Sequence, residues 1–167
     1  ATELPPKTEI PHLIELGTDE KDLYETVRST MDKHVRQALA IRGQEAQIVF
    51  LDALLKLRQI CCHPSLVANK DSDFSSNHPT QKPQQSGKFD YLKELLETLK
   101  KEKRKVLLFS QFTSMLDIIE EYLIEQQTSY LKLTGASKNR QELVEQFQAG
   151  EAEVFLISLK AGGTGLT

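Results

Sequence analysis

The most constraining feature of this sequence is the alternation of strand and helix patterns that fills residues 88–167. Short apolar runs, typical of buried strands, alternate there with amphipathic segments that have a helical period. Strands are expected at 106–110, 130–133 and 154–158, and helices at 89–100, 115–126 and 141–148. Strands joined by helices pair in parallel through right-handed crossovers, so both faces of their sheet are expected to be covered. The predicted fold class is α/β, with three layers around a parallel sheet of about three strands.

Two long helices are expected before this region. From Thr18 onward an apolar residue recurs every four positions, which predicts a helix of about twenty residues with its N-cap at Thr18 or Asp19. The apolar stripe consists of Leu23, Val27, Met31, Val35 and Leu39. A second helix is predicted over Ala46–Cys62, because Pro64 cannot continue it. The short separation of the two helices predicts a helical hairpin.

Residues 69–87 are predicted to form a linker or mobile loop, because they hold almost no aliphatic side chains that could be buried. The chain therefore divides into a helical segment at 1–68, this linker, and the α/β segment at 88–167. A formal net charge of −3 argues against nonspecific coating by nucleic acid, although a local basic patch is compatible with it. No apolar run reaches the roughly 18 residues of a membrane span, so no membrane partner is expected.

Two further clusters have ordinary structural explanations. Cys61 and Cys62 are adjacent and followed by His63, which we interpret as packing at a helix end rather than as a metal or redox site. The basic run Lys100–Lys105 is interpreted as a solvated helix end.

Three connections are expected to meet at one edge of the sheet, since ligands of parallel sheets lie beyond the carboxyl ends of the strands. All three contain the groups that bind phosphate: glycines that let backbone N–H groups approach an anion, hydroxyls that donate hydrogen bonds, and cations. The candidate residues are Ser110, Gln111, Thr113 and Ser114 after the first strand, Gly135, Ser137, Lys138 and Arg140 after the second, and Ser158, Lys160, Gly162, Gly163 and Gly165 after the third.

The residues alone predict that this edge binds a nucleotide phosphate or the backbone of a polyanion. The alternative is structural, because the same residue types are ordinary in turns and helix caps. The sequence has no Gly-Lys-Ser/Thr triplet of a Walker A loop and no carboxylate pair with an evident acid–base role. No catalytic residue and no metal ligand is therefore predicted.

Several segments carry a resemblance to a known family. In order and spacing, SGKFDYLKELLETL, KVLLFSQFTSMLDIIEEYL, GASKNRQELVEQF and VFLISLKAGGTGL resemble the second RecA-like lobe of the Swi/Snf-type helicase-like ATPases of superfamily 2. LRQICCHPSL resembles the signature that precedes this lobe, and LPPKTE resembles the segment that leaves the first lobe. The short GASKNR connection is similar to that of bacterial members. The resemblance implies a helical protrusion and a partial RecA-like second lobe that ends within motif V.

In that family two RecA-like lobes clamp ATP and move along one strand of duplex DNA without separating the strands. The resemblance places two sets of residues against the DNA backbone. These are Ser110, Gln111 and Thr113 in motif IV and Ser158, Lys160, Gly162 and Gly163 in motif V; Arg140 is placed on a phosphate, and Gly165 couples this contact to the nucleotide cleft. Thr134, Cys62 and Leu159-Lys160 stand where many members have Asp, Asn and Thr-Arg.

The resemblance implies a fragment of an ATP-dependent duplex-DNA translocase or remodeller. The Walker A lysine, the Asp-Glu magnesium pair, the motif V aspartate and the arginine-rich motif VI are expected outside this sequence, so the fragment is predicted to be inactive alone. ATP and Mg²⁺ are implied for the parent protein and none for the fragment. The implied partners are duplex DNA, the first lobe of the parent, and RNA polymerase or another DNA-bound protein. The implied location is the bacterial cytoplasm, at the nucleoid, or a eukaryotic nucleus.

Two other functions stay open at this point. An RNA helicase shares the RecA-like lobe, although single-strand helicases generally lack a two-helix insertion ending in ICCHPSL. The hairpin can instead serve as a protein-interaction module, in which case the stripe from Leu23 to Leu39 is expected to be partly exposed. In addition, three parallel strands leave an unpaired edge and an exposed apolar face, which favours dimers or exchanged elements.

Overall fold

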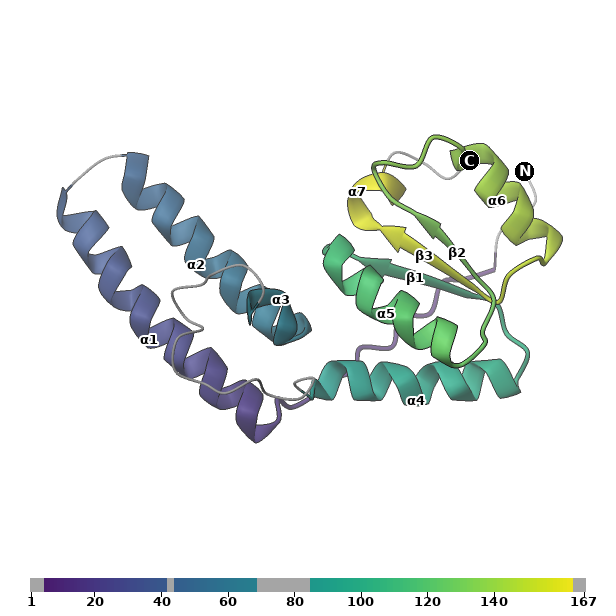
Figure 1. Ribbon diagram of the computed structural model, residues 1–167, viewed down its shortest axis with the longest axis horizontal. Helices are drawn as coiled ribbons and strands as arrows, with labels where there is room; N and C mark the ends of the chain where they lie inside the picture. Colours follow the sequence, from purple (N-terminus) through teal and green to yellow (C-terminus); the bar gives the residue numbers. More distant parts are fainter. Residues whose placement is uncertain (1–4, 42–43, 69–84, 164–167) are drawn as a thin grey trace.

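The structure, a computed structural model, describes residues 5–41, 44–68 and 85–163 and shows a helical hairpin beside an α/β lobe (Figure 1). The elements of the lobe are α4 (Gly87–Lys101), β1 (Val106–Ser110), α5 (Thr113–Glu125), β2 (Tyr130–Leu133), α6 (Arg140–Ala149), β3 (Val154–Ser158) and α7 (Leu159–Gly162). The strands lie in the order β1-β3-β2, and β3 pairs in parallel with both neighbours. The predicted parallel α/β fold is confirmed, and the three strands have the predicted bounds.

Strand β3 carries the core of the lobe on both of its faces. All five of its residues are buried. Val154 and Leu156 pack into the cluster formed by α4 and α5, whereas Phe155 and Ile157 pack into the cluster formed with α6 and α7. Because successive side chains of a strand point to opposite faces, a strand buried on both sides reads as a continuous apolar run, as this one does.

The expectation that both faces of the sheet are covered holds for β3 but not for β1. Leu107 and Phe109 point to the face that α6 and α7 cover over the other two strands, and they are 51% and 46% exposed. Helix α6 contacts β2 and α7 contacts β3, and α7 reaches β1 where Gly162 lies against the ring of Phe109, so Leu107 and much of Phe109 stay exposed. The exposed apolar face and the unpaired β1 edge were both expected for a sheet of three strands.

The hairpin consists of α1 (Thr18–Ile41) and α2 (Gln44–Cys62), which lie side by side, followed by the short helix α3 (Ser65–Ala68) (Figure 1). Val27 and Met31 of the predicted stripe are buried against α2. The stripe is therefore covered at its centre, and only Leu39, which is 60% exposed, lies open near its end. More of the exposed apolar side chains lie on α2, among them Ile48, Leu51 and Leu55.

A buried glutamate joins the hairpin to the lobe. Glu20, in the first turn of α1, is 1% exposed, and its Oε2 accepts hydrogen bonds from the backbone N–H groups of Gly17 at 2.8 Å and Gly87 at 3.0 Å. The Ser86 hydroxyl adds a second link, because it donates to the carbonyl of Cys62 at 3.3 Å and caps α4 by accepting from Phe89 N–H. The start of α4 is thus tied to both helices of the hairpin.

This arrangement corrects the predicted start of the first helix. The expected cap was Thr18 or Asp19, but the helix already begins at Thr18, and Glu20 reaches back to the N–H of Gly17. The same contact explains why residue 87 is a glycine, since a Cβ on it would lie 2.8 Å from the carbonyl oxygen of Glu15. Only glycine lets the segment before α1 pass this close to the start of α4.

Most of the predicted linker at 69–87 lies outside the described residues, and so does Gly165. Within the ranges that the structure describes, no helix combines the length and the apolar character that a membrane crossing requires.

Candidate nucleic-acid interface

The carboxyl ends of the three strands form one row of hydroxyl residues. Ser110 at the end of β1 pairs in register with Ser158 at the end of β3. On the other side, Leu133 of β2 pairs with Ile157, so Thr134 comes one step beyond, beside Ser158. The three connections that the sequence singled out therefore start at the same edge of the sheet, as predicted.

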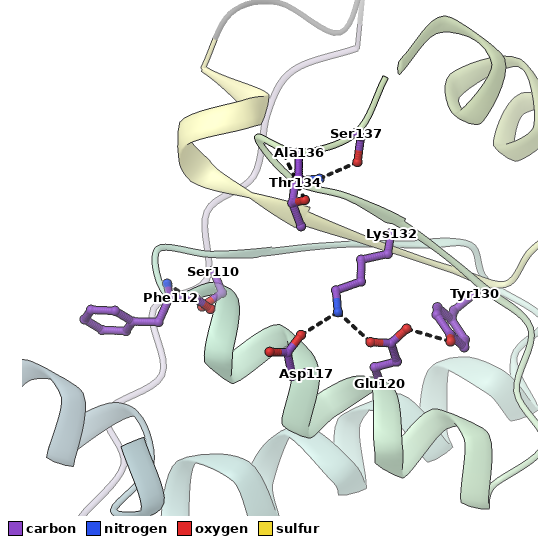
Figure 2. Close-up of polar contacts among 9 residues, drawn as sticks. All are labelled: Ser110, Phe112, Asp117, Glu120, Tyr130, Lys132, Thr134, Ala136 and Ser137. Carbon is purple, nitrogen blue, oxygen red and sulfur yellow. Dashed lines mark hydrogen bonds and ion pairs between the residues drawn. The ribbon is translucent and has the colours of Figure 1, made fainter. Parts of the chain in front are cut away.

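The hydroxyls in the first two connections form hydrogen bonds with the backbone of their own loops. The Ser110 Oγ accepts from the N–H of Phe112 and donates to its carbonyl, both at 3.1 Å. In the second connection the Ser137 Oγ accepts from Thr134 N–H at 3.0 Å, and the Thr134 Oγ1 accepts from Ala136 N–H at 3.4 Å. Figure 2 shows both sets of contacts. These hydroxyls shape the edge, which is the structural role that the sequence left as the alternative.

The third connection differs from the expected glycine loop, because Leu159–Gly162 forms the short helix α7. Ser158 caps it: its hydroxyl accepts from Ala161 N–H at 3.3 Å, and the residue is only 2% exposed. Gly162 is needed for close packing, since a Cβ there would lie 3.1 Å from both Ile157 Cγ2 and Phe109 Cε1. Sequence reasoning expected a loop because three glycines follow so closely, but the buried cap favours a helical turn.

The charged residues of the three connections all have one sign. Segments 110–114, 134–140 and 158–163 contain Lys138, Arg140 and Lys160 and no Asp or Glu, whereas the whole chain has a net charge of −3. Lys138 and Lys160 are exposed, and Arg140 is half-buried at the start of α6. The edge is thus a local basic patch on an acidic chain, a distribution that attracts polyanions.

Three more predicted residues lie at this edge and are exposed to solvent. Thr113 is the first residue of α5 and is exposed, and Gly163, which follows α7, is exposed as well. Gly135 has no atom within 4 Å of the position that a Cβ would occupy. A ligand can therefore approach the backbone at Gly135, whereas the N–H of Gly163 already donates to the carbonyl of Leu159 at 2.9 Å.

One residue of this edge was missed by sequence reasoning. The guanidinium of Arg58, on α2 of the hairpin, donates a hydrogen bond to the side-chain carbonyl oxygen of Gln111 in the first connection. Both side chains are exposed. The signature LRQICCHPSL contained Arg58, but no periodicity indicates that this side chain reaches a loop 53 residues away.

A separate ion-pair network lies below the edge and fastens β2 to α5 (Figure 2). Lys132 on β2 contacts the carboxylates of Asp117 and Glu120, and the Tyr130 hydroxyl donates to Glu120 at 2.7 Å. The hydrogen bond from Lys132 lowers the pKa of Glu120. Burial alone would lower the pKa of Lys132, but its bonds to both acids outweigh burial and raise it. With its charge neutralised, Lys132 is a structural cation rather than a candidate ligand for phosphate.

The basic run at 100–105 lies at the opposite end of the sheet, where two of its lysines bind groups at the ends of helices. The Lys100 ammonium donates to the carbonyl of Gln126 at 3.2 Å and to the Thr128 hydroxyl at 2.9 Å, just after α5 ends. Lys105 donates to the carbonyls of Phe147 at 3.1 Å and Gln148 at 3.3 Å, in the last turn of α6. Cations are favoured at the carboxyl ends of helices, so these two lysines stabilise helix ends.

The CCH cluster is packed at the end of α2. Burial raises the pKa of both Cys61 and Cys62, which keeps the thiols protonated, and both are free. The Nδ1 of His63 accepts from the backbone N–H of Ser65 at 3.2 Å, and its ring lies edge-on to Phe89. Among the described residues no group of three His, Cys, Asp or Glu side chains is placed to hold a metal ion.

Comparison with known proteins gives a consistent result. The conserved C-terminal domain of helicases matches residues 87–167. The chain is 31% identical over 167 residues to the human SWI/SNF-related matrix-associated actin-dependent regulator of chromatin subfamily A member 1, covering 98% of this chain and 16% of that protein. The chain thus spans less than a fifth of this relative's length.

Two solved structures share the fold. The SWI2/SNF2 ATPase C-terminal domain of Sulfolobus solfataricus superimposes with a TM-score of 0.71 at 25% identity, over 91% of this chain and 63% of that one. The C-terminal part of the Fun30 ATPase domain gives a TM-score of 0.72 at 24% identity, over 98% of this chain and 72% of that one. The lobe of Figure 1 therefore has the architecture of these C-terminal domains.

Proposed function

Residues 87–167 are a helicase C-terminal domain and the chain is homologous to SWI/SNF-type chromatin-remodelling ATPases, and from this we propose that it is the part of a duplex-DNA translocase that grips the DNA backbone. In this proposal residues 1–68 form the helical protrusion and residues 88–167 the partial second RecA-like lobe. The proposed backbone contacts are Gln111, Thr113, Arg140, Lys160, Gly162 and Gly163, with Gly165 coupling them to the nucleotide cleft, while Ser110 and Ser158 hold the connections in shape.

The observation that carries the proposal is that the charged side chains in the three connections are all positive. Three cations and no acid lie in the connections at the carboxyl ends of the strands, on a chain that is acidic overall. Phosphate contacts supply most of the sequence-independent affinity for DNA, and cations at a sheet edge with exposed glycines suit them. The buried hydroxyl of Ser158 supports a role in shaping the site rather than in touching the ligand.

Duplex binding by the chain at several salt concentrations tests the proposal directly. Lys160→Ala and Arg140→Ala should each weaken binding and reduce the slope of log K against log salt by about one unit. Lys101→Ala is the matched control, because this exposed lysine lies at the far end of α4, near the amino ends of the strands. Equal slopes for Lys160→Ala and Lys101→Ala would remove the edge from the DNA contacts.

ATP hydrolysis belongs, in this proposal, to the parent protein. The three connections hold no carboxylate that could bind Mg²⁺, so no step of phosphoryl transfer is assigned to these residues. The parent should hydrolyse ATP faster with duplex DNA, whereas this chain alone should show no turnover. Equal stimulation of the parent by single-stranded RNA would instead favour the RNA helicase alternative, which the SWI/SNF-type relatives already make less attractive.

The partners and location follow from the same proposal. Duplex DNA and the first lobe of the parent are the proposed partners, and RNA polymerase or another DNA-bound protein is a further candidate. The relative named above is human, and its name associates it with chromatin, so we favour a eukaryotic nucleus. A bacterial origin, expected from the short GASKNR connection, receives no support from that relative.

A further inference from the structure

We propose that Arg58 of the hairpin is a positioning residue for the DNA grip: it orients the side-chain amide of Gln111 so that its NH₂ group faces the phosphate backbone. This inference rests on the proposed function, and it adds a role for a residue outside the lobe. Its starting point is the hydrogen bond between the Arg58 guanidinium and Gln111 Oε1, which joins α2 to the connection after β1.

The chemistry of the two groups fixes the orientation of the amide. A guanidinium has only donors, whereas a glutamine amide has one accepting oxygen and one donating NH₂ group. The oxygen of Gln111 must therefore face Arg58, and the two N–H donors are directed away from it. A phosphate oxygen needs donors, so an amide turned the other way would present its oxygen to the anion and repel it.

Arg58 is held in place by elements that do not depend on the edge itself. It lies in the last two turns of α2, and the carbonyl of Cys62 at the end of this helix accepts from the Ser86 hydroxyl at the start of the lobe. Glu20 ties α1 to the same point through Gly87. The hairpin is thus fastened to the lobe below the site, and Arg58 extends from it to the first connection.

Arg58 supplies the side-chain hydrogen bond that the described structure gives to this amide. Gln111 is exposed, and residues 110–114 contain no charged side chain. The hydroxyl of Ser110 is engaged with the backbone of Phe112 on both its donor and its acceptor side. Without Arg58 the Gln111 side chain would sample many rotamers, and it would lose side-chain entropy when DNA binds.

The test is a double-mutant cycle on duplex binding by this chain. Arg58→Met and Gln111→Ala should each lower duplex affinity about tenfold, because a hydrogen bond from the amide to a charged phosphate is left unaligned in one variant and lost in the other. The double variant should lose no more than the stronger single variant, because both changes remove the same contact. Arg36→Met, at an exposed arginine in the C-terminal half of α1, is the control and should leave affinity unchanged.

The salt dependence separates positioning from direct contact. Because a neutral amide releases no counterion, Arg58→Met should leave the slope of log K against log salt unchanged, whereas Lys160→Ala lowers it by about one unit. A slope that falls by about one unit for Arg58→Met would assign Arg58 to a phosphate itself and overturn the positioning role. Additive losses in the cycle would overturn it as well.

The two proposals fail in different ways. If wild type binds duplex DNA and Lys160→Ala weakens it while Arg58→Met has no effect, only the role of Arg58 is refuted. If wild type shows no salt-dependent duplex binding at all, the proposed function fails, and the role of Arg58 fails with it. The Gln111 side-chain NH₂ signals in an NMR spectrum give a readout without DNA, since Arg58→Met should shift and narrow them as the amide becomes mobile.

Discussion

Removing the Glu20 carboxylate should destabilise the junction between the hairpin and the lobe more than any exposed charge does. The side chain is 1% exposed, and one oxygen accepts from Gly17 N–H and Gly87 N–H at 2.8 and 3.0 Å. In Glu20→Ala both N–H groups lose their partner. In Glu20→Gln an uncharged oxygen remains to accept them.

The size of the effect follows from opposing contributions. A hydrogen bond to a charged group is worth roughly 1.5–3 kcal/mol, so two of them amount to about 3–6 kcal/mol. Against this, the carboxylate was desolvated on folding, and its Oε1 has no hydrogen-bond partner in the described structure. We expect Glu20→Ala to lower the free energy of unfolding by about 2–4 kcal/mol and Glu20→Gln by about half as much.

Urea unfolding at 25 °C, followed by circular dichroism, measures the loss. Glu25→Ala on the same helix is the matched control, because Glu25 is 59% exposed and pairs with Arg28 at the surface, where such pairs contribute under about 1 kcal/mol. Hydrogen exchange of the Gly87 amide reports the contact itself and should lose protection only in the Glu20 variants. The reasoning is refuted if Glu20→Ala and Glu25→Ala agree within about 0.5 kcal/mol.

Three further predictions concern single contacts. The hydrogen bond from Lys132 lowers the pKa of Glu120, so this pair stabilises the fold above about pH 4.5 and its contribution is lost as pH falls. In Glu120→Gln the free energy of unfolding should therefore fall less steeply between about pH 5 and 3 than in the wild type. Burial lowers the pKa of His63 below 6.5, so as pH falls the unfolded chain binds a proton at His63 before the folded chain does. Urea unfolding should therefore show the free energy of unfolding falling from about pH 7.5 to 5.5. Replacing His63 by Gln should remove this dependence. Lys105→Met removes an ammonium that binds the last carbonyls of α6 and lies 5.5 Å from the centroid of the Phe147 ring. The variant should have a melting temperature lowered by an amount equivalent to about 1 kcal/mol of stability. An unchanged melting temperature would show that the contact does not stabilise the fold.

The sequence predicted the elements of the lobe because their signals are local. Strands at 106–110, 130–133 and 154–158 are short apolar runs, and their bounds agree with the structure. The helices were predicted in the right places, although α4 begins two residues earlier than expected because Ser86 caps it. The short helix α7 was missed, since its cap is a buried serine at the end of a strand and its last residue is glycine.

The contacts that organise the site could not be predicted, because they join residues distant in the chain. Glu20 and Gly87 are separated by 67 positions, and Arg58 and Gln111 by 53. Neither pair leaves a periodic pattern, and each depends on how the hairpin packs against the lobe. Cores can be inferred from which residues are apolar, whereas a polar link between two packed units requires their relative orientation.

The distribution of hydroxyls and charges at the edge bears on what the site can recognise. Ser110, Ser137 and Ser158 were candidates for ligand contact, yet their hydroxyls form hydrogen bonds with nearby backbone groups. The groups left facing outward include the cations Lys138 and Lys160, the amide of Gln111 and the exposed backbone at Gly135. Charges and backbone N–H groups bind phosphates without distinguishing bases. In the proposed function such an edge would hold the DNA backbone whatever its base sequence.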